Sequence, residues 1–472
     1  MLVSRSAANS IVQKLRQSGH QAYLVGGCVR DLVLSREPAD YDVATDATPD
    51  QVMGIFPRSY GVGAQFGVVL IPVDGYAAQA APPQPNGRDV TCYVSLAADT
   101  KTPTIEVATF RSDIGYSDGR HPDQVRYTTS AKEDVQRRDF TINGLLYDPL
   151  DDKVIDYVGG LADIRRGVIQ TIGDPEQRFR EDKLRMLRAV RFAARFTYQI
   201  EPATFAAIQQ LASQVRQVSC ERIREELTKM LTEGHARRAF ELLDESTLLQ
   251  QVLPEVAAMK GVQQPPQFHP EGDVWIHTLL LLERLPQPCP KTLAWGALLH
   301  DLGKPPTFRV APDRIRFDEH VSVGTRMAEE ICRRLRFSND DTEQIAALVA
   351  NHMRFADMLR MKDSTLKRFL RLPRFEEHLE LHRLDCLSSH GDLTLYDFAK
   401  QKLASTPAHQ IRPRPLLTGR DLIAAGYKPA PLFKEILAAV EDAQLEGQLH
   451  TQQEALEFVR SHYPATGSGN QS

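Results

Sequence analysis

Residues 24–45, LVGGCVRDLVLSREPADYDVAT, decide the fold of the first part of this chain. The stretch begins at the end of a short apolar segment that reads as a strand, and Gly26 and Gly27 end it because glycine tolerates a tight turn. A helix follows, whose N-terminus favours anions and leaves room for a phosphate. In the next predicted strand Asp40 and Asp42 are one residue apart, so their side chains leave the same face. The stretch predicts a strand, a helix and a strand that combine a phosphate gap with two carboxylates.

The flanking sequence predicts an N-terminal α/β unit. Apolar residues at helical spacing predict a helix over 6–18, and a Thr cap followed by Pro predicts a second helix near 48–56. Strands are expected at 66–73 and 104–110, and the Ala-, Pro- and Gly-rich segment between them is expected to be an insertion at about 73–103. From about residue 174 almost everything up to residue 463 is helical in period.

The composition is that of an ordinary folded protein. The chain has 472 residues, of which 42% are hydrophobic and 25% charged, and its net charge is −4. It has no long apolar segment, which predicts a cytoplasmic protein without a membrane span. Its 6 cysteines are spread singly, which favours free thiols over a disulfide framework. Basic residues outnumber acidic ones over 165–195, which indicates either a phosphate-binding surface or a solvated helix face.

Asp40 and Asp42 can share a metal ion. In two-metal phosphoryl or nucleotidyl transfer, oxygen ligands hold divalent ions about 4 Å apart. Glu106, in a neighbouring predicted strand, can supply a third oxygen ligand. Arg30, in the first turn of the helix after the glycines, can add a charged donor to a phosphate.

The pattern GGxVRDxxL followed by DYD resembles the signature of polymerase-beta-like nucleotidyltransferases, in the branch of bacterial CCA-adding tRNA nucleotidyltransferases and bacterial poly(A) polymerases. The resemblance implies an α+β fold: a small nucleotidyltransferase head with a mixed sheet and helices, then an all-α neck, an HD domain and a helical C-terminal body. It implies Mg²⁺ on Asp40 and Asp42, with the glycines Gly26 and Gly27 admitting the triphosphate.

Two further segments extend this resemblance. RRDFTINGL (137–145) matches the family's ribose and phosphate segment, which implies that Arg138 contacts the nucleotide and that Asp139 and Asn143 lie near its sugar. DPEQRFREDKLRMLRAVRFAARF (174–196) matches the EDxxR region. There Asp182 and Arg185 are at i,i+3 and are expected on one helix face, where an acceptor beside a donor can imitate a Watson–Crick edge.

In the same segment, Arg188 and Arg191 are expected to face phosphates. The resemblance implies that CTP and ATP are selected without a nucleic-acid template. ERIREE (221–226) fits the family's ERxxxE element and is expected to support the pocket. The loop over 111–125 resembles the family's flexible loop, which favours addition of the full CCA sequence.

A second candidate metal site centres on ALLHDLGK, where His and Asp are adjacent at the end of an apolar helix. Imidazole and carboxylate ligands from separate helices can hold one or two hydrolytic ions, and imidazole favours a transition metal such as Ni²⁺ or Mn²⁺ over Mg²⁺. The pattern resembles that of HD phosphohydrolases. The residues that fill it are His277, His300, Asp301, His320, His352 and Asp385.

The sequence therefore predicts an enzyme that adds CMP and AMP to the 3′ end of tRNA from CTP and ATP, releasing pyrophosphate. Three alternatives remain open: a poly(A) polymerase, a protein whose HD hydrolase is the main activity, and a noncatalytic RNA-binding adaptor. The expected domains are a head at 1–150, a neck with an RNA-binding surface at 151–265, an HD domain at 266–400, a tRNA-binding segment at 401–464 and a disordered tail at 465–472.

Overall fold

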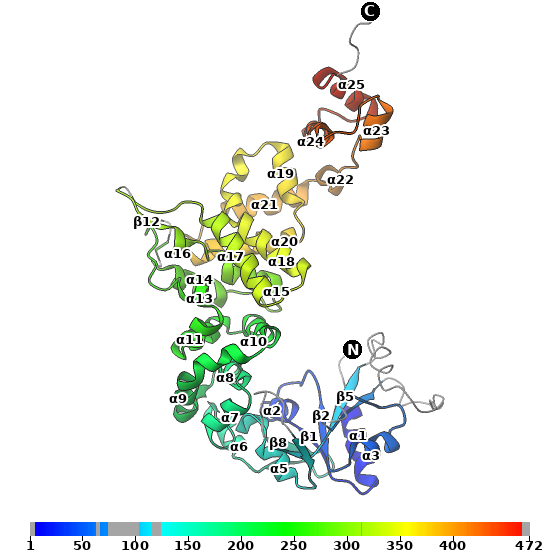
Figure 1. Ribbon diagram of the computed structural model, residues 1–472, viewed down its shortest axis with the longest axis vertical. Coiled ribbons are helices and arrows are strands. Elements are labelled where there is room, and N and C mark those ends of the chain that lie inside the picture. Colours follow the sequence, from blue (N-terminus) through cyan, green and yellow to red (C-terminus); the bar gives the residue numbers. More distant parts are fainter. Residues whose placement is uncertain are drawn as a thin grey trace, which may run out of the picture. The chain divides into compact units, whose positions relative to one another are not determined.

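The computed structural model describes residues 5–62, 67–73, 103–114, 124–267, 269–270, 272–312 and 314–464. Contacts divide the chain into two compact units, Met1–Pro254 and Glu255–Ser472, called here the N-terminal and C-terminal units (Figure 1). The predicted division into four domains and a tail is finer and stays a prediction. Most of the predicted insertion, the middle of the 111–125 loop and the tail lie outside the described residues.

A seven-stranded mixed sheet lies at the centre of the N-terminal unit. Its strands β2 and β5 run parallel, and every other neighbouring pair is antiparallel. The register places Asp42 opposite Glu106 on one side and opposite Val25 on the other. In spatial order the strands are β3 (Tyr60–Gly61), β4 (Val68–Pro72), β5 (Thr104–Thr109), β2 (Asp42–Thr45), β1 (Ala22–Val25), β8 (Leu145–Asp148) and β9 (Lys153–Asp156).

Local sequence explains why these elements form. Helix α1 (Arg5–Gln17) buries Ala8, Ile11, Val12 and Leu15 at helical spacing and contacts β1 and β2. Helix α3 (Pro49–Ile55) starts at a capping box between Thr48 and Gln51. In β5, Ile105, Val107 and Thr109 are buried whereas Glu106 is exposed, so this carboxylate leaves the face opposite to that core.

Helices make up most of the rest of the N-terminal unit. Two short strand pairs interrupt them: β6 (Arg111–Ile114) with β7 (Gln124–Tyr127), and β10 (Val168–Ile169) with β11 (Gln199–Ile200). The helices are α2 (Gly27–Val33), α5 (Ala131–Gln136), η3 (Thr141–Asn143), α6 (Gly160–Arg166), α7 (Pro175–Glu181), α8 (Leu184–Phe196), α9 (Pro202–Leu211), η4 (Ala212–Gln217), α10 (Cys220–Thr232), α11 (Ala236–Glu245), α12 (Leu249–Val252) and, across the boundary, α13 (Pro254–Ala257).

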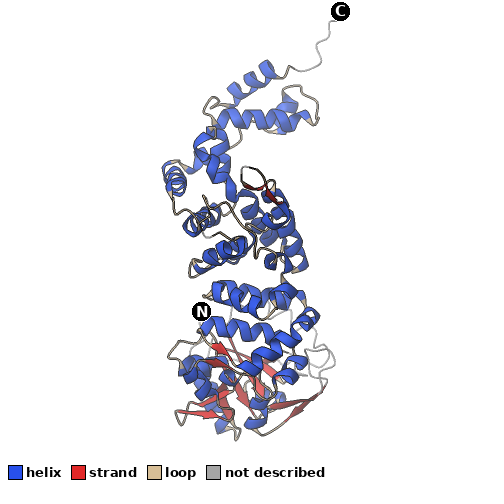
Figure 2. Ribbon diagram, turned by 90° about the vertical axis from the view of Figure 1, so that its left-hand side faces the viewer, coloured by secondary structure: helices blue, strands red, loops and turns tan. Residues whose placement is uncertain are grey.

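The described part of the C-terminal unit is helical apart from one hairpin, β12 (Phe308–Val310) with β13 (Ile315–Phe317), seen as the red loop among blue helices in Figure 2. Its helices are α14 (Val274–Glu283), α15 (Lys291–Leu299), α16 (Lys304–Thr307), α17 (His320–Arg334), α18 (Asn339–Asn351), η5 (His352–Arg360), α19 (Asp363–Leu370), α20 (Phe375–Ser388), α21 (Thr394–Ser405), α22 (Ala408–Ile411), α23 (Gly419–Ala424), α24 (Leu432–Leu445) and α25 (Gln452–His462). The predicted α+β fold with a helical body is confirmed, although the hairpin was not expected.

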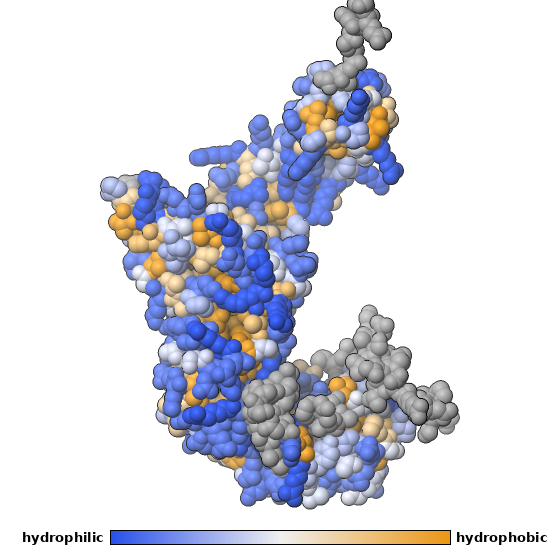
Figure 3. All heavy atoms as spheres, in the orientation of Figure 1, coloured by the Kyte–Doolittle hydropathy of each residue, from blue (hydrophilic) through white to orange (hydrophobic). Residues whose placement is uncertain are grey.

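The last helices of the C-terminal unit have a small core of their own, which includes Leu422, Ile436, Val440 and Val459. Apolar side chains also reach the surface of this segment, among them Ile423 (Figure 3). Within the described residues, no helix combines the length and apolar character needed to cross a membrane. The five cysteines in the described part of the chain are free, as predicted, and Cys92 lies outside it.

The C-terminal unit should lose stability in acid because its core contains neutral histidines. Burial lowers the pKa of His378 and of His382 to about 4, whereas an unfolded histidine titrates near about 6.5. The unfolded chain therefore takes up protons first, and stability should fall from about pH 6.5 towards pH 4, by about 1.4 kcal/mol per histidine per pH unit. Urea unfolding at pH 7.0 and 5.5 measures this effect. Trp275 and Trp295 report on this unit by fluorescence, because both tryptophans are buried in it.

The variant His378→Phe keeps an aromatic side chain and removes one titrating group. Its loss of stability between the two pH values should be smaller than that of the unchanged protein. An equal loss of stability in the two proteins would show that His378 does not contribute to the effect of pH.

Candidate functional site

Three carboxylates lie near the start of β2, where this strand pairs with β5. Asp42 begins β2 opposite Glu106, and Asp40 lies just before that strand. Burial, and then repulsion from Glu106 and Asp40, raise the pKa of Asp42 to about 7. Carboxylates that crowd one another in this way fit a divalent cation, because its charge relieves the repulsion. The three residues predicted for the head site therefore lie in one electrostatic environment.

Arg138 lies beside these carboxylates and above the glycine turn. Its charge partly offsets the raised pKa of Asp42. A Cβ atom added to Gly26 would lie 3.4 Å from Nη1 of Arg138, and Gly26 has a φ of 78°. A side chain at this position would therefore be strained and would crowd the guanidinium. Asp134 holds Arg138 in place through an ion pair of 3.0 Å.

Four residues predicted to bind the nucleotide form one hydrogen-bonded chain. Arg30 Nη1 donates to Asn143 Oδ1 over 2.7 Å, and Asn143 Nδ2 donates to Asp139 Oδ1 over 3.1 Å. Arg188 then donates to Asp139 Oδ2 from Nε over 2.9 Å and from Nη2 over 2.7 Å. Although burial opposes ionisation, Arg188 and Asn143 lower the pKa of Asp139 to about 2.

This chain corrects the role expected for Arg30. Its side chain is buried, it pairs with Asp31, and its guanidinium lies 4.6 Å from the ring centre of Phe196. It is therefore placed to hold Asn143 rather than to reach a phosphate. Arg188 is likewise paired with Asp139. The expected contact between Arg188 and a phosphate would therefore have to form beside this ion pair.

Asp182 and Arg185 do not share one helix face, because the chain breaks between two helices at this point. Helix α7 ends at Glu181 and α8 begins at Leu184, and Asp182 between them is extended, with φ −140° and ψ 105°. Its side chain accepts from the backbone of Leu184 over 3.1 Å, which stabilises the start of α8. The expectation from the i,i+3 spacing that Asp182 and Arg185 lie on one helix face is therefore wrong.

Each of these two residues is held by a separate partner. Arg222 donates to both carboxylate oxygens of Asp182, over 3.2 and 2.8 Å. Arg185 donates to Glu181 over 2.8 Å and to the carbonyl oxygen of Arg178 over 3.0 Å. Asp182, the expected acceptor, and Arg185, the expected donor, are thus held by different partners. Arg222 belongs to the ERIREE segment that was expected to support the pocket. Glu181 is the first residue of the EDxxR motif and stands at i,i+4 from Arg185, but no role was expected for it from the sequence.

The expectation that Arg191 faces phosphates is wrong. Arg191 is only 5% exposed, and its Nε donates to Glu226 over 2.6 Å. Its Nη1 also donates to Glu233 over 3.3 Å. Arg191 therefore ties α8 to α10 in the interior. Removing one partner of such a buried pair typically costs about 3–5 kcal/mol.

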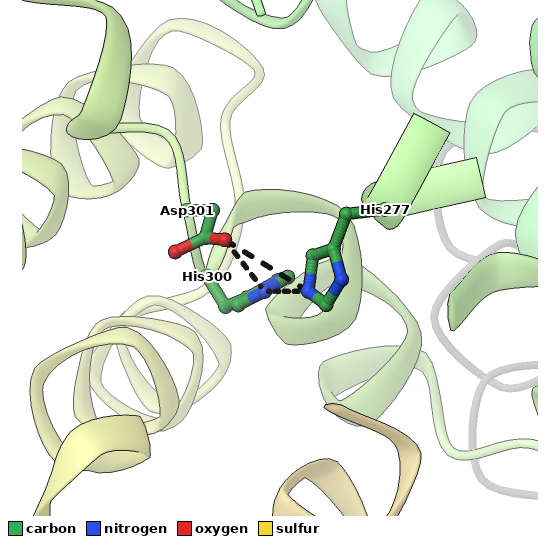
Figure 4. Close-up of side chains that lie close together, drawn as sticks. All are labelled: His277, His300 and Asp301. Carbon is green, nitrogen blue, oxygen red and sulfur yellow. Dashed lines mark hydrogen bonds and ion pairs between the residues drawn. The ribbon is translucent and has the colours of Figure 1, made fainter. Parts of the chain in front are cut away.

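The six residues predicted for the second site all lie in the C-terminal unit, around Asp301. Two groups of ligand atoms, each with all members within 4.8 Å of one another, share this carboxylate: one with His277 and His300, and one with His320 and His352. Figure 4 shows the first group, in which His277 from α14 turns towards His300 and Asp301 at the end of α15. Nε2 of His277 is 3.2 Å from Nε2 of His300.

Backbone contacts aim three of these imidazoles. Nδ1 of His300, His320 and His352 each contacts the carbonyl oxygen three residues earlier, over 2.9, 2.8 and 2.6 Å. Nδ1 is then the protonated nitrogen, and Nε2 keeps a lone pair for a metal. In His320 and His352, Nε2 is buried and has no hydrogen-bond partner among the described residues. Burial also lowers the pKa of His352 to about 4, which keeps it in the neutral form that binds metals.

The remaining predicted ligand and three unpredicted side chains complete this region. Asp385 Oδ1 is 3.1 Å from His277 Nε2. Lys304 Nζ is 2.7 Å from Asp301 Oδ2 and 2.6 Å from Gln264 Oε1. The ring of His269 lies edge-on to that of His277, with centres 5.0 Å apart. Gln264 and His269 come from a Pro-rich break, which carried no signal for a site.

Glycine allows the turn after Asp301 to pack against α17. A Cβ atom on Gly303 would lie 2.0 Å from the carbonyl oxygen of His320. The HDLGK segment therefore needs glycine at this position, so that the helix that begins with His320 can lie close to the HD pair.

Three protein families match successive parts of the chain. Residues 22–84 and 84–170 match the family described as Poly A polymerase head domain. Residues 197–260 match the family described as Probable RNA and SrmB-binding site of polymerase A, and residues 273–384 match the HD domain. Head and HD domains of these kinds generally use divalent metals. The two groups of histidine and aspartate ligands lie within the HD match, and Asp40, Asp42 and Glu106 lie within the head match.

Curated relatives include the CCA-adding enzyme of Lactobacillus helveticus, 36% identical over 281 residues, which are 58% of this chain and 63% of the relative. The CCA-adding enzyme of Geobacillus stearothermophilus is 40% identical over 241 residues, 51% of this chain and 53% of the relative. The chain thus spans less than two thirds of the length of these relatives.

Solved structures extend the likeness over the whole chain. The Bacillus stearothermophilus CCA-adding enzyme in complex with CTP matches with a TM-score of 0.70 and 27% identity, over 97% of this chain and 98% of that one. The Thermotoga maritima CCA-adding enzyme complexed with tRNA shares the fold, with a TM-score of 0.56 and 19% identity over 97% and 96% of the two chains.

Binding of a divalent cation at the head carboxylates should weaken in acid. Because the pKa of Asp42 is raised to about 7, protons compete with the cation below that pH. The apparent affinity should fall about tenfold per pH unit below pH 7 and level off above pH 8. Calorimetric titration with Mn²⁺ at pH 6 and 8 measures this, in a His300→Ala, Asp301→Ala background that disables the second site. Equal Mn²⁺ affinities at the two pH values, or an unchanged pH dependence in Asp42→Asn, would contradict the role of Asp42 as the group at which protons compete with the cation.

Proposed function

We propose that the protein, whose residues 22–170 match the family described as Poly A polymerase head domain, adds CMP and AMP to the 3′ end of tRNA. CTP and ATP are the substrates and pyrophosphate is the second product. The proposal is supported by CCA-adding enzymes among the curated relatives and among the solved structures that match nearly the whole chain.

One observation of the structure carries the proposal: Asp42 lies opposite Glu106 in the parallel pair and beside Arg138, and its pKa is raised to about 7. A site with this charge arrangement fits a cation that binds a triphosphate. Asp40 and Asp42, with Glu106, would hold Mg²⁺, which in this chemistry lowers the pKa of the attacking hydroxyl and neutralises the triphosphate. Arg138 would hold the phosphates over the glycine turn at Gly26.

Protein side chains would select the base. Asp182 would accept from the exocyclic amine that cytosine and adenine share, and Arg185 would donate to the neighbouring ring atom. The two side chains can keep this arrangement because Arg222 and Glu181 hold them separately. Asn143 and Asp139 would lie near the ribose, braced by Arg30 and Arg188. The region over 197–260 would contact the tRNA through its phosphates and shape.

A second, metal-dependent phosphohydrolase activity is favoured by the histidine cluster around Asp301. Its buried Nε2 atoms fit a transition metal such as Ni²⁺ or Mn²⁺ better than Mg²⁺, which prefers oxygen ligands. One ion would be held by His277, His300, Asp301 and Asp385. A second ion next to it would be held by His320 and His352. An ion at such a site activates water for attack on a phosphate ester.

One assay separates the candidate functions. Labelled tRNA that ends before CCA is incubated with the protein and Mg²⁺, with CTP, ATP or both. Extension by three nucleotides supports CCA addition. Long tails of A indicate a poly(A) polymerase, and phosphate release without extension makes the HD hydrolase the main activity. No reaction of either kind would favour a noncatalytic adaptor.

Asp42→Ala should reduce extension at least a thousandfold, because it removes a ligand that would act in the transition state. Hydrolysis of a phosphate ester by the Mn²⁺-loaded protein should be unchanged, since Asp42 is not in the C-terminal unit. Asp50→Ala, at an exposed aspartate in α3, is the matched control and should leave both activities intact. Extension by Asp42→Ala at the rate of the control would overturn the proposed active site.

Arg222→Leu should raise the KM for CTP and ATP about tenfold or more, because it leaves the carboxylate of Asp182 without its two donors. Steady-state kinetics with each nucleotide measures the change. Arg222→Lys retains the charge but not the two-point contact and should fall in between. An unchanged KM in Arg222→Leu would show that Asp182 does not depend on this arginine.

A further inference from the structure

Gln264 is a buried polar residue that neither of the proposed activities uses. It lies in the break before α14, and its side chain is only 1% exposed. The loop that carries it is fastened at several points. Gln264 N donates to the carbonyl oxygen of Gly272 over 2.7 Å, and Gly261 N donates to Asp273, whose side chain also caps α14. Gln264 is therefore held against the helix that supplies His277.

The chemistry of Lys304 fixes the orientation of the Gln264 amide. An ammonium group only donates hydrogen bonds, so the atom 2.6 Å from Lys304 Nζ must be the oxygen of Gln264. The amide nitrogen is then on the other side. In the described part of the chain Nε2 of Gln264 is buried without any hydrogen-bond partner. A buried donor without an acceptor is costly and points to a missing ligand.

The surroundings define what that ligand must be. Lys304 is 6% exposed and lies 2.7 Å from Asp301 Oδ2, the carboxylate shared by the two groups of metal ligands. Lys304 thus joins the amide of Gln264 to Asp301, the shared metal ligand. An anionic oxygen suits the donor at Gln264 Nε2, because a charged acceptor makes the stronger hydrogen bond and the ammonium group of Lys304 offsets the negative charge of Asp301.

We propose that Gln264 and Lys304 form a subsite for a non-bridging oxygen of a phosphate ester. Gln264 donates to this oxygen through Nε2 and holds Lys304 beside it through Oε1. The inference rests on the proposed phosphohydrolase function and deepens it, because it assigns the substrate contact of that site to a residue outside the six predicted ligands.

Gln264→Glu is the deciding variant. It keeps the size of the side chain and an oxygen facing Lys304, but it replaces the donor by an anionic oxygen. A purely structural Gln264 tolerates this change, since a carboxylate oxygen still accepts the hydrogen bond from Lys304. A Gln264 that donates to phosphate does not tolerate it. The adjacent Gln263 is exposed, so Gln263→Glu is the matched control for charge.

The full-length protein is tested in three measurements. The metal-free protein is titrated with Mn²⁺ by calorimetry. The protein loaded with Mn²⁺ is then titrated with inorganic phosphate and assayed for hydrolysis of bis-p-nitrophenyl phosphate. In Gln264→Glu, Mn²⁺ affinity should be kept or increased. The Kd for phosphate and the KM for the ester should each rise about 10- to 100-fold, the range expected for a lost hydrogen bond to a charged group. Gln263→Glu should match the unchanged protein in all three.

Unchanged phosphate affinity and KM in Gln264→Glu would overturn the proposal and leave a bound water as the partner of Nε2. A parallel loss of Mn²⁺ affinity would also overturn it, because Gln264 would then support the metal ligands. If Gln264→Glu does not fold, Gln264→Met removes the donor at similar length and should weaken phosphate binding to the same degree. If the unchanged protein binds Mn²⁺ and phosphate but hydrolyses no ester, the hydrolase proposal fails, and the phosphate titrations alone decide the subsite.

Discussion

Crowding of carboxylates where β2 runs parallel to β5 is the constraint on which the rest of the N-terminal unit depends. The parallel register puts Asp42 directly opposite Glu106, and Asp40 adds a third negative charge. Burial of Asp42 makes this repulsion costly, and protons, a metal cation or a nearby positively charged side chain relieve it. Arg138 supplies part of that compensation, and a divalent cation would supply the rest. The same electrostatic repulsion would favour the binding of a cation.

Helix α8 connects this edge to the region that would recognise the base. Each of its three inward arginines meets an acidic partner from a different element: Arg185 meets Glu181, Arg188 meets Asp139, and Arg191 meets Glu226. Such partly or fully buried pairs fix position more surely than they add stability. The helix therefore has little freedom to turn, which suits a protein that would read a base with side chains in place of a template.

Much of the fold and of both candidate sites could be predicted from the sequence, because the decisive residues are close together along the chain. The DYD pair, the glycine turn and the HDLGK segment each require particular residue types at short spacing. The errors arose where partners are distant. Arg191 is paired with residues 35 and 42 positions away, and Arg30 with one 113 positions away, so no local pattern could show that they are buried. The break after Glu181 was missed because Asp182, the C-cap of α7, lies inside a continuous polar run that carries no glycine or proline to mark the end of a helix. Gln264 lies in a Pro-rich segment whose composition indicates only a loop.

A crystal structure of the protein with Mn²⁺ and a nonhydrolysable CTP analogue shows whether the head carboxylates hold the cation beside the nucleotide. We expect anomalous density from Mn²⁺ in contact with Asp40 and Asp42, and a cytosine whose amine faces Asp182. Mn²⁺ density confined to the histidine cluster, or a nucleotide bound away from β2 and β5, would contradict this expectation.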